Sequence, residues 1–97
     1  MKKLTNEIFN AVAKVYNLSL QDILQEGKTG SIIEARKMTM YLLNRYTDLS
    51  SEEIREALGG CNEEIVKHEI DAVSCSIRAG DSKVLDAFFS CINNIGK

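Results

Sequence analysis

The sequence predicts an all-α protein, a compact six-helix domain that contains a helix-turn-helix. Proline is absent from its 97 residues, whereas the helix-favouring Leu, Ala, Glu, Lys and Ile are abundant. A short helical pattern stops at Gly59 and Gly60, and a long one restarts at Asn62. A helix, a tight glycine turn and a second helix outline a helix-turn-helix, here at about 50–79. The length predicts a single domain over 1–97.

Two helices are predicted before the first loop. Apolar residues at helical spacing indicate a helix over 5–16, capped by Thr5 or Asn6 and stopped by Asn17. A second, short helix is expected to start near Ser19. Its inward residues are expected to be Leu20, Ile23 and Leu24.

Residues 25–30 are predicted to form a loop. Its Gly27-Lys28-Thr29 is similar to the end of a phosphate-binding P-loop, but that motif needs a glycine where Asp22 stands and a preceding strand. We therefore expect no nucleotide site. Lys28 is interpreted as an exposed basic residue, either solvated or in contact with a partner.

The third predicted helix is the central and most buried one. A capping box of Ser31 and Glu34 opens it, and it runs to about Tyr46. Arg36 and Lys37 are expected on its exposed side. Its inward residues are expected to be Ile33, Met38, Tyr41, Leu42 and either Met40 or Leu43.

The predicted helix-turn-helix follows. Ser50-Ser51-Glu52-Glu53 is a second capping box, which opens a helix of about two turns that stops at Gly59. Asn62 caps the next helix, which runs to about Ala79. The inward residues of these two helices are expected to be Ile54, Ala57, Leu58, Val66, Ile70, Val73 and Ile77.

Gly80 and Asp81 are predicted to end the preceding helix and to begin a last one. Its apolar face is expected to consist of Val84, Leu85, Phe88, Phe89, Ile92 and Ile95.

The charge is distributed unevenly. The net charge of −2 argues against strong nonspecific nucleic-acid binding, because phosphate neutralisation dominates such affinity. Residues 27–47 nevertheless carry four basic residues and one acidic residue, whereas residues 48–71 carry eight acidic residues and two basic ones. A basic segment thus runs directly into an acidic one that contains the second helix of the helix-turn-helix.

No catalytic or metal-binding constellation is apparent in the sequence. Cys61, Cys75 and Cys91 lack metal-ligand spacing and His68 is the only histidine, so no metal or cofactor is expected. The cysteines are interpreted as buried or half-buried free thiols in a reducing compartment. Acidic pairs in the first turns of helices are explained by the helix dipole, so no enzymatic activity is expected.

The location of the protein is predicted from what the sequence lacks. Its apolar runs are too short to span a membrane, and Met1-Lys2-Lys3-Leu4 is not followed by the apolar stretch of a signal peptide. These observations favour a cytoplasmic protein.

The central stretch reads Ala35-Arg36-Lys37-Met38-Thr39-Met40-Tyr41-Leu42-Leu43, and the glycine turn is preceded by Ala57-Leu58. With these motifs, nearly the whole chain resembles the C-terminal DNA-binding domain (domain IV) of the bacterial replication initiator DnaA, a fold related to that of the Trp repressor. Matching positions elsewhere are Val12–Tyr16, Asp22–Leu24, Ile54, Gly59-Gly60, Val66 and His68. The resemblance implies a six-helix fold that binds double-stranded DNA.

The resemblance also implies positions for DNA contacts. Lys28, followed by Thr29, stands where the family places a basic loop residue in the minor groove, and Arg36 and Lys37 match positions near the phosphate backbone. The first turn of the second helix departs from the family signature Arg-Asp-His-Thr-Thr. The chain has instead Cys61, Asn62, Glu63, Glu64 and Ile65.

Two functional hypotheses follow. In the first, the chain binds double-stranded DNA with altered or weakened specificity. The backbone would be held by Lys28, Thr29, Arg36 and Lys37, and the groove would be met by Asn62, Glu63, Glu64 and Lys67. In the second, the chain kept the fold, lost DNA binding and uses its acidic surface to bind a basic protein partner or a second copy of itself.

Overall fold

The computed structural model describes residues 2–25, 29–60 and 62–95, and these form six helices and no strand. The helices are α1 (Lys2–Tyr16), α2 (Leu20–Leu24), α3 (Gly30–Tyr46), α4 (Ser51–Ala57), α5 (Glu63–Arg78) and α6 (Ser82–Asn94). The predicted all-α class is therefore confirmed. None of the helices in these ranges is long and apolar enough to cross a membrane.

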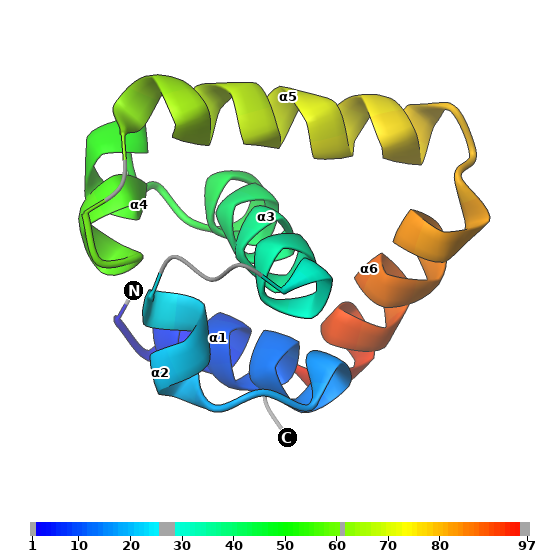
Figure 1. Ribbon diagram of the computed structural model, residues 1–97, viewed down its shortest axis with the longest axis horizontal. Helices are drawn as coiled ribbons and strands as arrows, with labels where there is room; N and C mark the ends of the chain where they lie inside the picture. Colours follow the sequence, from blue (N-terminus) through cyan, green and yellow to red (C-terminus); the bar gives the residue numbers. More distant parts are fainter. Residues whose placement is uncertain (1, 26–28, 61, 96–97) are drawn as a thin grey trace.

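α3 is the central helix, as predicted. α5 lies on one side of it and α1 and α2 lie on the opposite side (Figure 1). α4 also packs against it, and α6 contacts it through the ring of Phe88 on Tyr41. Buried side chains occur on every face of its middle turns, including Met38, Tyr41, Leu42 and Leu43. The buried hydroxyl of Thr39 donates to the Ala35 carbonyl oxygen at 2.8 Å, so this polar group costs little desolvation energy.

The predicted stops and starts are largely confirmed. Asn17 ends α1 in the left-handed conformation with φ 56°. The Ser19 hydroxyl caps α2 and accepts from the Asp22 amide at 3.1 Å. Gly80 has φ 79° after α5, and the Asp81 carboxylate caps α6 by accepting from the Val84 amide at 3.2 Å.

Two helix starts differ from the prediction. α1 begins at Lys2, so Thr5 and Asn6 lie inside the helix rather than at its cap. α3 is capped by Thr29, whose hydroxyl accepts from the Ile32 amide at 3.4 Å, so Ser31 lies in the first turn. Thr29 has the extended backbone that an N-cap requires, which explains why this hydroxyl is used.

Four predicted core residues are instead exposed: Leu20, Leu24, Ile33 and Phe89. α2 has only five residues, so Ile23 alone fills the buried face. Consecutive residues diverge by about 100° around a helix, and α6, unlike the central α3, buries only one face, so Phe88 and Phe89 cannot both point inward. Phe88 is buried and packs edge-on against Tyr41, whereas Phe89 is 56% exposed.

The prediction that the cysteine thiols are buried or half-buried holds for Cys91 but not for Cys75. Cys91 is fully buried, and burial raises the pKa of its thiol to about 12. Cys75 is exposed, contrary to the expectation of a buried or half-buried thiol, because the inward stripe of α5 passes through Val66 and Val73. Cys61 lies outside the described residues.

Candidate nucleic-acid interface

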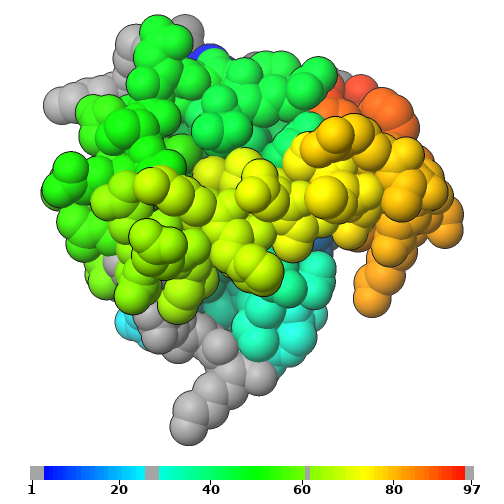
Figure 2. All heavy atoms as spheres, turned by 90° about the horizontal axis from the view of Figure 1, so that it is seen from above, coloured from blue at the N-terminus to red at the C-terminus, as the bar shows by residue number. Residues whose placement is uncertain are grey.

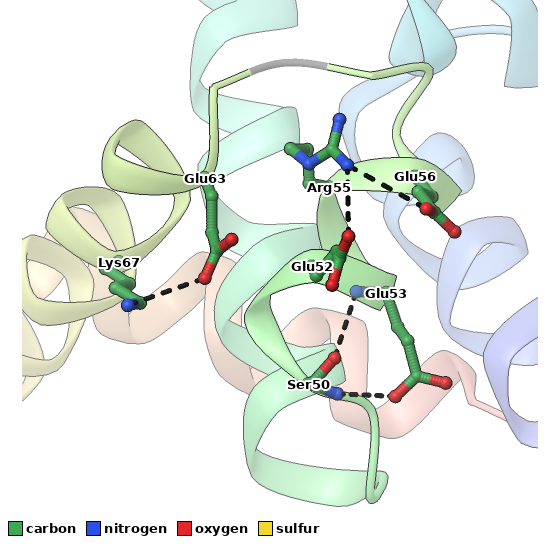
Figure 3. A network of polar contacts seen from close by, with 7 residues as sticks. All are labelled: Ser50, Glu52, Glu53, Arg55, Glu56, Glu63 and Lys67. Atoms are coloured by element: carbon green, nitrogen blue, oxygen red, sulfur yellow. Dashed lines mark hydrogen bonds and ion pairs between the residues drawn. The ribbon is translucent and has the colours of Figure 1, made fainter.

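The candidate interface is built on α4, the turn after it and α5. Ser50 and Glu53 form the predicted capping box of α4 (Figure 3): the Ser50 hydroxyl accepts from the Glu53 amide at 3.1 Å, and the Ser50 amide donates to Glu53 Oε1 at 2.9 Å. Ile54 and Leu58 are buried and anchor α4 to the core. The capping box therefore stabilises the first turn of α4, and the buried side chains hold the helix against the core up to the turn that follows it.

The turn depends on two glycines. Gly59 and Gly60 both have φ 90°, a left-handed conformation that L side chains rarely adopt. The Gly60 amide donates to the Arg55 carbonyl oxygen at 2.9 Å, which satisfies a carbonyl at the end of α4. Gly59 lies against α2, since a Cβ built on it would overlap the carbonyl oxygen of Leu24. Gly59 thus has a conformational role and a packing role.

α5 presents its first turns to solvent. The Asn62 side chain caps the helix and accepts from the Glu64 amide at 2.8 Å, as predicted. Val66 and Val73 face the core, which leaves Glu64, Lys67 and His68 exposed. Seen from above, α5 crosses this whole face of the molecule, with α4 at its first turns and the beginning of α3 beside it (Figure 2). The exposed surface of α5 is therefore accessible to a large partner.

The basic side chains near this surface are paired with carboxylates. Lys67 Nζ lies 3.5 Å from Glu63 Oε2, and Arg55 Nη2 lies 3.7 Å from Glu52 Oε1 and 3.8 Å from Glu56 Oε1 (Figure 3). Such exposed pairs contribute little stability and exchange readily for other partners. They nevertheless lower the positive charge that an approaching phosphate would meet.

Lys37 links α3 to α5. Its Nζ lies 3.4 Å from Glu69 Oε2 on α5 and 3.9 Å from Glu34 Oε1 on α3. The side chain is half-exposed, so its ammonium remains near the surface. The structure thus brings Lys37 beside the helix that carries Asn62, Glu63, Glu64 and Lys67. Glu69 was not predicted as part of this site, because it lies 32 positions after Lys37 and no local spacing in the sequence reveals the contact.

Arg36 does not lie where it was predicted. It was expected on the exposed side of α3 and near the phosphate backbone, but it is 6% exposed. Its Nη1 donates to the carbonyl oxygens of Ile23, at 2.5 Å, and Leu58, at 3.1 Å. These carbonyl groups lie at the C-terminal ends of α2 and α4. The sequence pattern does not reveal that they come close enough to Arg36 to accept hydrogen bonds from it. The guanidinium therefore points into the protein.

Thr29 and Lys28 are the two predicted DNA contacts near the start of α3, and the structure describes the first of them. Thr29 is exposed and caps α3, so its hydroxyl is already used by the Ile32 amide. Lys28 lies outside the described residues. Among the residues that the structure does describe, no three His, Cys, Asp or Glu side chains are grouped so that they could hold a metal ion.

Residues 5–73 match the family model described as the bacterial dnaA protein helix-turn-helix. The chain belongs to this DnaA family. The resemblance inferred from the sequence is thereby confirmed, and α4 and the first turns of α5 lie inside the matched region.

A full-length relative gives the same result. The chromosomal replication initiator protein DnaA of Gloeobacter violaceus is 36% identical to the chain over 75 residues. The aligned region covers 76% of this chain but 17% of the initiator. The chain thus corresponds to a small part of a DnaA protein, and α6 lies beyond the segment that the family model matches.

Proposed function

We propose that the chain is a double-stranded DNA-binding module of the DnaA type with altered or weakened sequence specificity. The observation that carries the proposal is the exposed beginning of α5, which follows a tight glycine turn in a chain of the DnaA helix-turn-helix family. The second helix of a helix-turn-helix enters the major groove with its first residues toward the base edges.

The polar groups of this surface can be assigned to parts of the duplex. Asn62 Oδ1 accepts the Glu64 amide, so its NH₂ group is left to donate to a base acceptor. The exposed Glu64 carboxylate can only accept, which suits the amino group of cytosine. Glu63 lies between Asn62 and Glu64 in the sequence and forms an ion pair with Lys67. A reading surface with these groups prefers bases that differ from those preferred by His and Thr.

Phosphate contacts are assigned to lysines. Lys67 is exposed on α5 and Lys37 is half-exposed beside it, and both can exchange their carboxylate partners for phosphate. The segment from Ser50 to Ala79 contains seven acidic and three basic residues. Each carboxylate near the phosphate line repels it, so the affinity is expected to be low and sensitive to salt.

Lys67→Ala is expected to weaken duplex binding several-fold, because it removes one phosphate contact and leaves Glu63 without its cation. Arg78→Ala is the matched control, since Arg78 is an exposed basic residue at the other end of the same helix, where its Nη2 donates to the Ser74 hydroxyl at 3.3 Å. Fluorescence anisotropy on a labelled duplex measures both. Equal losses for the two variants would show that only net charge matters and would contradict the assignment of Lys67.

A second function is favoured by the ion pairs themselves. Lys37, Arg55 and Lys67 each lie within 4.0 Å of a carboxylate, and the helix-turn-helix carries a net negative charge. A surface of this kind suits a basic protein partner better than a phosphate backbone. This candidate is separated from the first by whether the chain binds a duplex at low salt.

A further inference from the structure

The buried guanidinium of Arg36 joins two helix ends that are distant in the sequence. Ile23 lies in the last turn of α2, and Leu58 is the C-cap of α4. One nitrogen, Arg36 Nη1, donates to the backbone carbonyl of each. Carbonyls at helix ends lack partners within the helix and carry partial negative charge, so two of them together suit a cation. This arrangement explains how a charged side chain is tolerated at 6% exposure.

A separate backbone contact joins the same two helix ends. A Cβ at Gly59 would overlap the Leu24 carbonyl oxygen and would lie 3.5 Å from its carbonyl carbon. The backbones of Gly59 and Leu24 therefore touch directly, one residue beyond each of the two carbonyls that Arg36 holds. Hydrogen bonding and close packing thus fix the end of α2 to the turn of the helix-turn-helix.

Short stretches of chain connect this junction to the two helix beginnings that form the proposed DNA surface. The chain leaves α2 at Leu24 and enters α3 at the Thr29 cap, five residues later. It leaves α4 at Leu58 and enters α5 at the Asn62 cap, four residues later. The beginnings of α3 and α5 are therefore both attached to the junction by short segments.

We propose that Arg36 is a positioning residue for duplex binding. Together with the direct packing of α3 against α5, it holds the beginnings of these two helices in a fixed relative position, so that both meet the same duplex in a single binding event. The proposal rests on the proposed DNA-binding function. When the DNA contacts of α3 and those of α5 belong to one rigid body, the second group of contacts forms at high effective concentration. Little conformational entropy is then lost on binding. Arg36 thus acts from inside the protein, without touching phosphate.

The dependence of affinity on salt separates positioning from phosphate contact. Arg36→Met removes both hydrogen bonds and is expected to weaken duplex binding by roughly tenfold, because the ends of α2 and α4, and with them the beginnings of α3 and α5, are then less well ordered before binding. The slope of log K against log salt is expected to stay unchanged, since no phosphate contact is removed. Lys37→Ala, on the neighbouring residue, is the matched control and is expected to reduce the slope by about 0.9.

The experiment uses the whole chain and a random-sequence duplex titrated at four salt concentrations. Folding of each variant is checked by circular dichroism, and if Arg36→Met does not fold, Arg36→Gln is compared by the same two quantities. Unchanged affinity, or a slope reduced by about 0.9, would overturn the positioning role and leave the proposed function standing. If the wild-type chain does not bind the duplex at any salt concentration, the proposed function itself fails, and the positioning role with it.

Discussion

Gly59→Ala is expected to lower the free energy of unfolding by about 2–5 kcal/mol, because a conformational cost and a steric cost add up at this position. The left-handed backbone at φ 90° costs a residue with a Cβ about 1–2 kcal/mol. The added Cβ also overlaps the Leu24 carbonyl oxygen, which is backbone at the end of α2 and cannot rotate away. Forcing such an overlap typically adds about 1–3 kcal/mol.

Gly60→Ala is the matched control for this prediction. Gly60 has the same φ of 90°, but a Cβ built there meets nothing within 4 Å. Only the conformational cost applies, so a loss of about 1–2 kcal/mol is expected. Urea denaturation followed by circular dichroism measures both variants. If the two substitutions prove equally harmful, the close approach of Gly59 to α2 does not contribute to stability.

The double substitution of Glu63→His and Glu64→Thr is expected to raise the affinity for the DnaA family's origin box by tenfold or more. It restores the residue types of the family signature in the first turn of α5. Each carboxylate removed from the phosphate line is worth roughly 1 kcal/mol at moderate effective dielectric, and 1.4 kcal/mol is a tenfold change. Lys67 is also released from its pair with Glu63.

Glu52→Gln with Glu56→Gln is the control for net charge. It removes two negative charges from α4, and there too a basic residue, Arg55, loses its carboxylate partners. The measurement is a titration of both double variants against the origin box and against a scrambled duplex. If the α4 variant gains as much affinity for the box as the α5 variant, the gain reflects overall charge and the reading role of residues 63 and 64 is wrong.

The fold could be predicted because its signals are local. Helix caps are built from residues within a few positions of each other, as with Ser50 and Glu53 or Asn62 and Glu64. Left-handed stops at Asn17 and Gly59 depend on one residue each. Helical periodicity then assigns the buried face of long helices, and it fails where a helix is as short as α2.

The site could be predicted only in part because its decisive contacts are not local. Arg36 was assigned to the surface because charged residues are almost never fully buried. Its acceptors lie 13 and 22 residues away, so no spacing in the sequence reveals them. The pair of Lys37 with Glu69 is hidden for the same reason. The assignment of Thr29, Lys37, Asn62, Glu63, Glu64 and Lys67 to parts of a duplex stays a prediction.

Titration of the wild-type chain on a random-sequence duplex at about 50 mM and about 200 mM salt tests the central claim most directly. DNA binding through Lys37, Lys67 and the predicted loop residue Lys28 is expected to give a log K that falls with log salt. The expected slope is roughly −2 to −3, at about −0.9 for each phosphate neutralised. Absence of binding at the lower salt concentration would contradict the claim and would favour a protein module that uses its acidic helix-turn-helix.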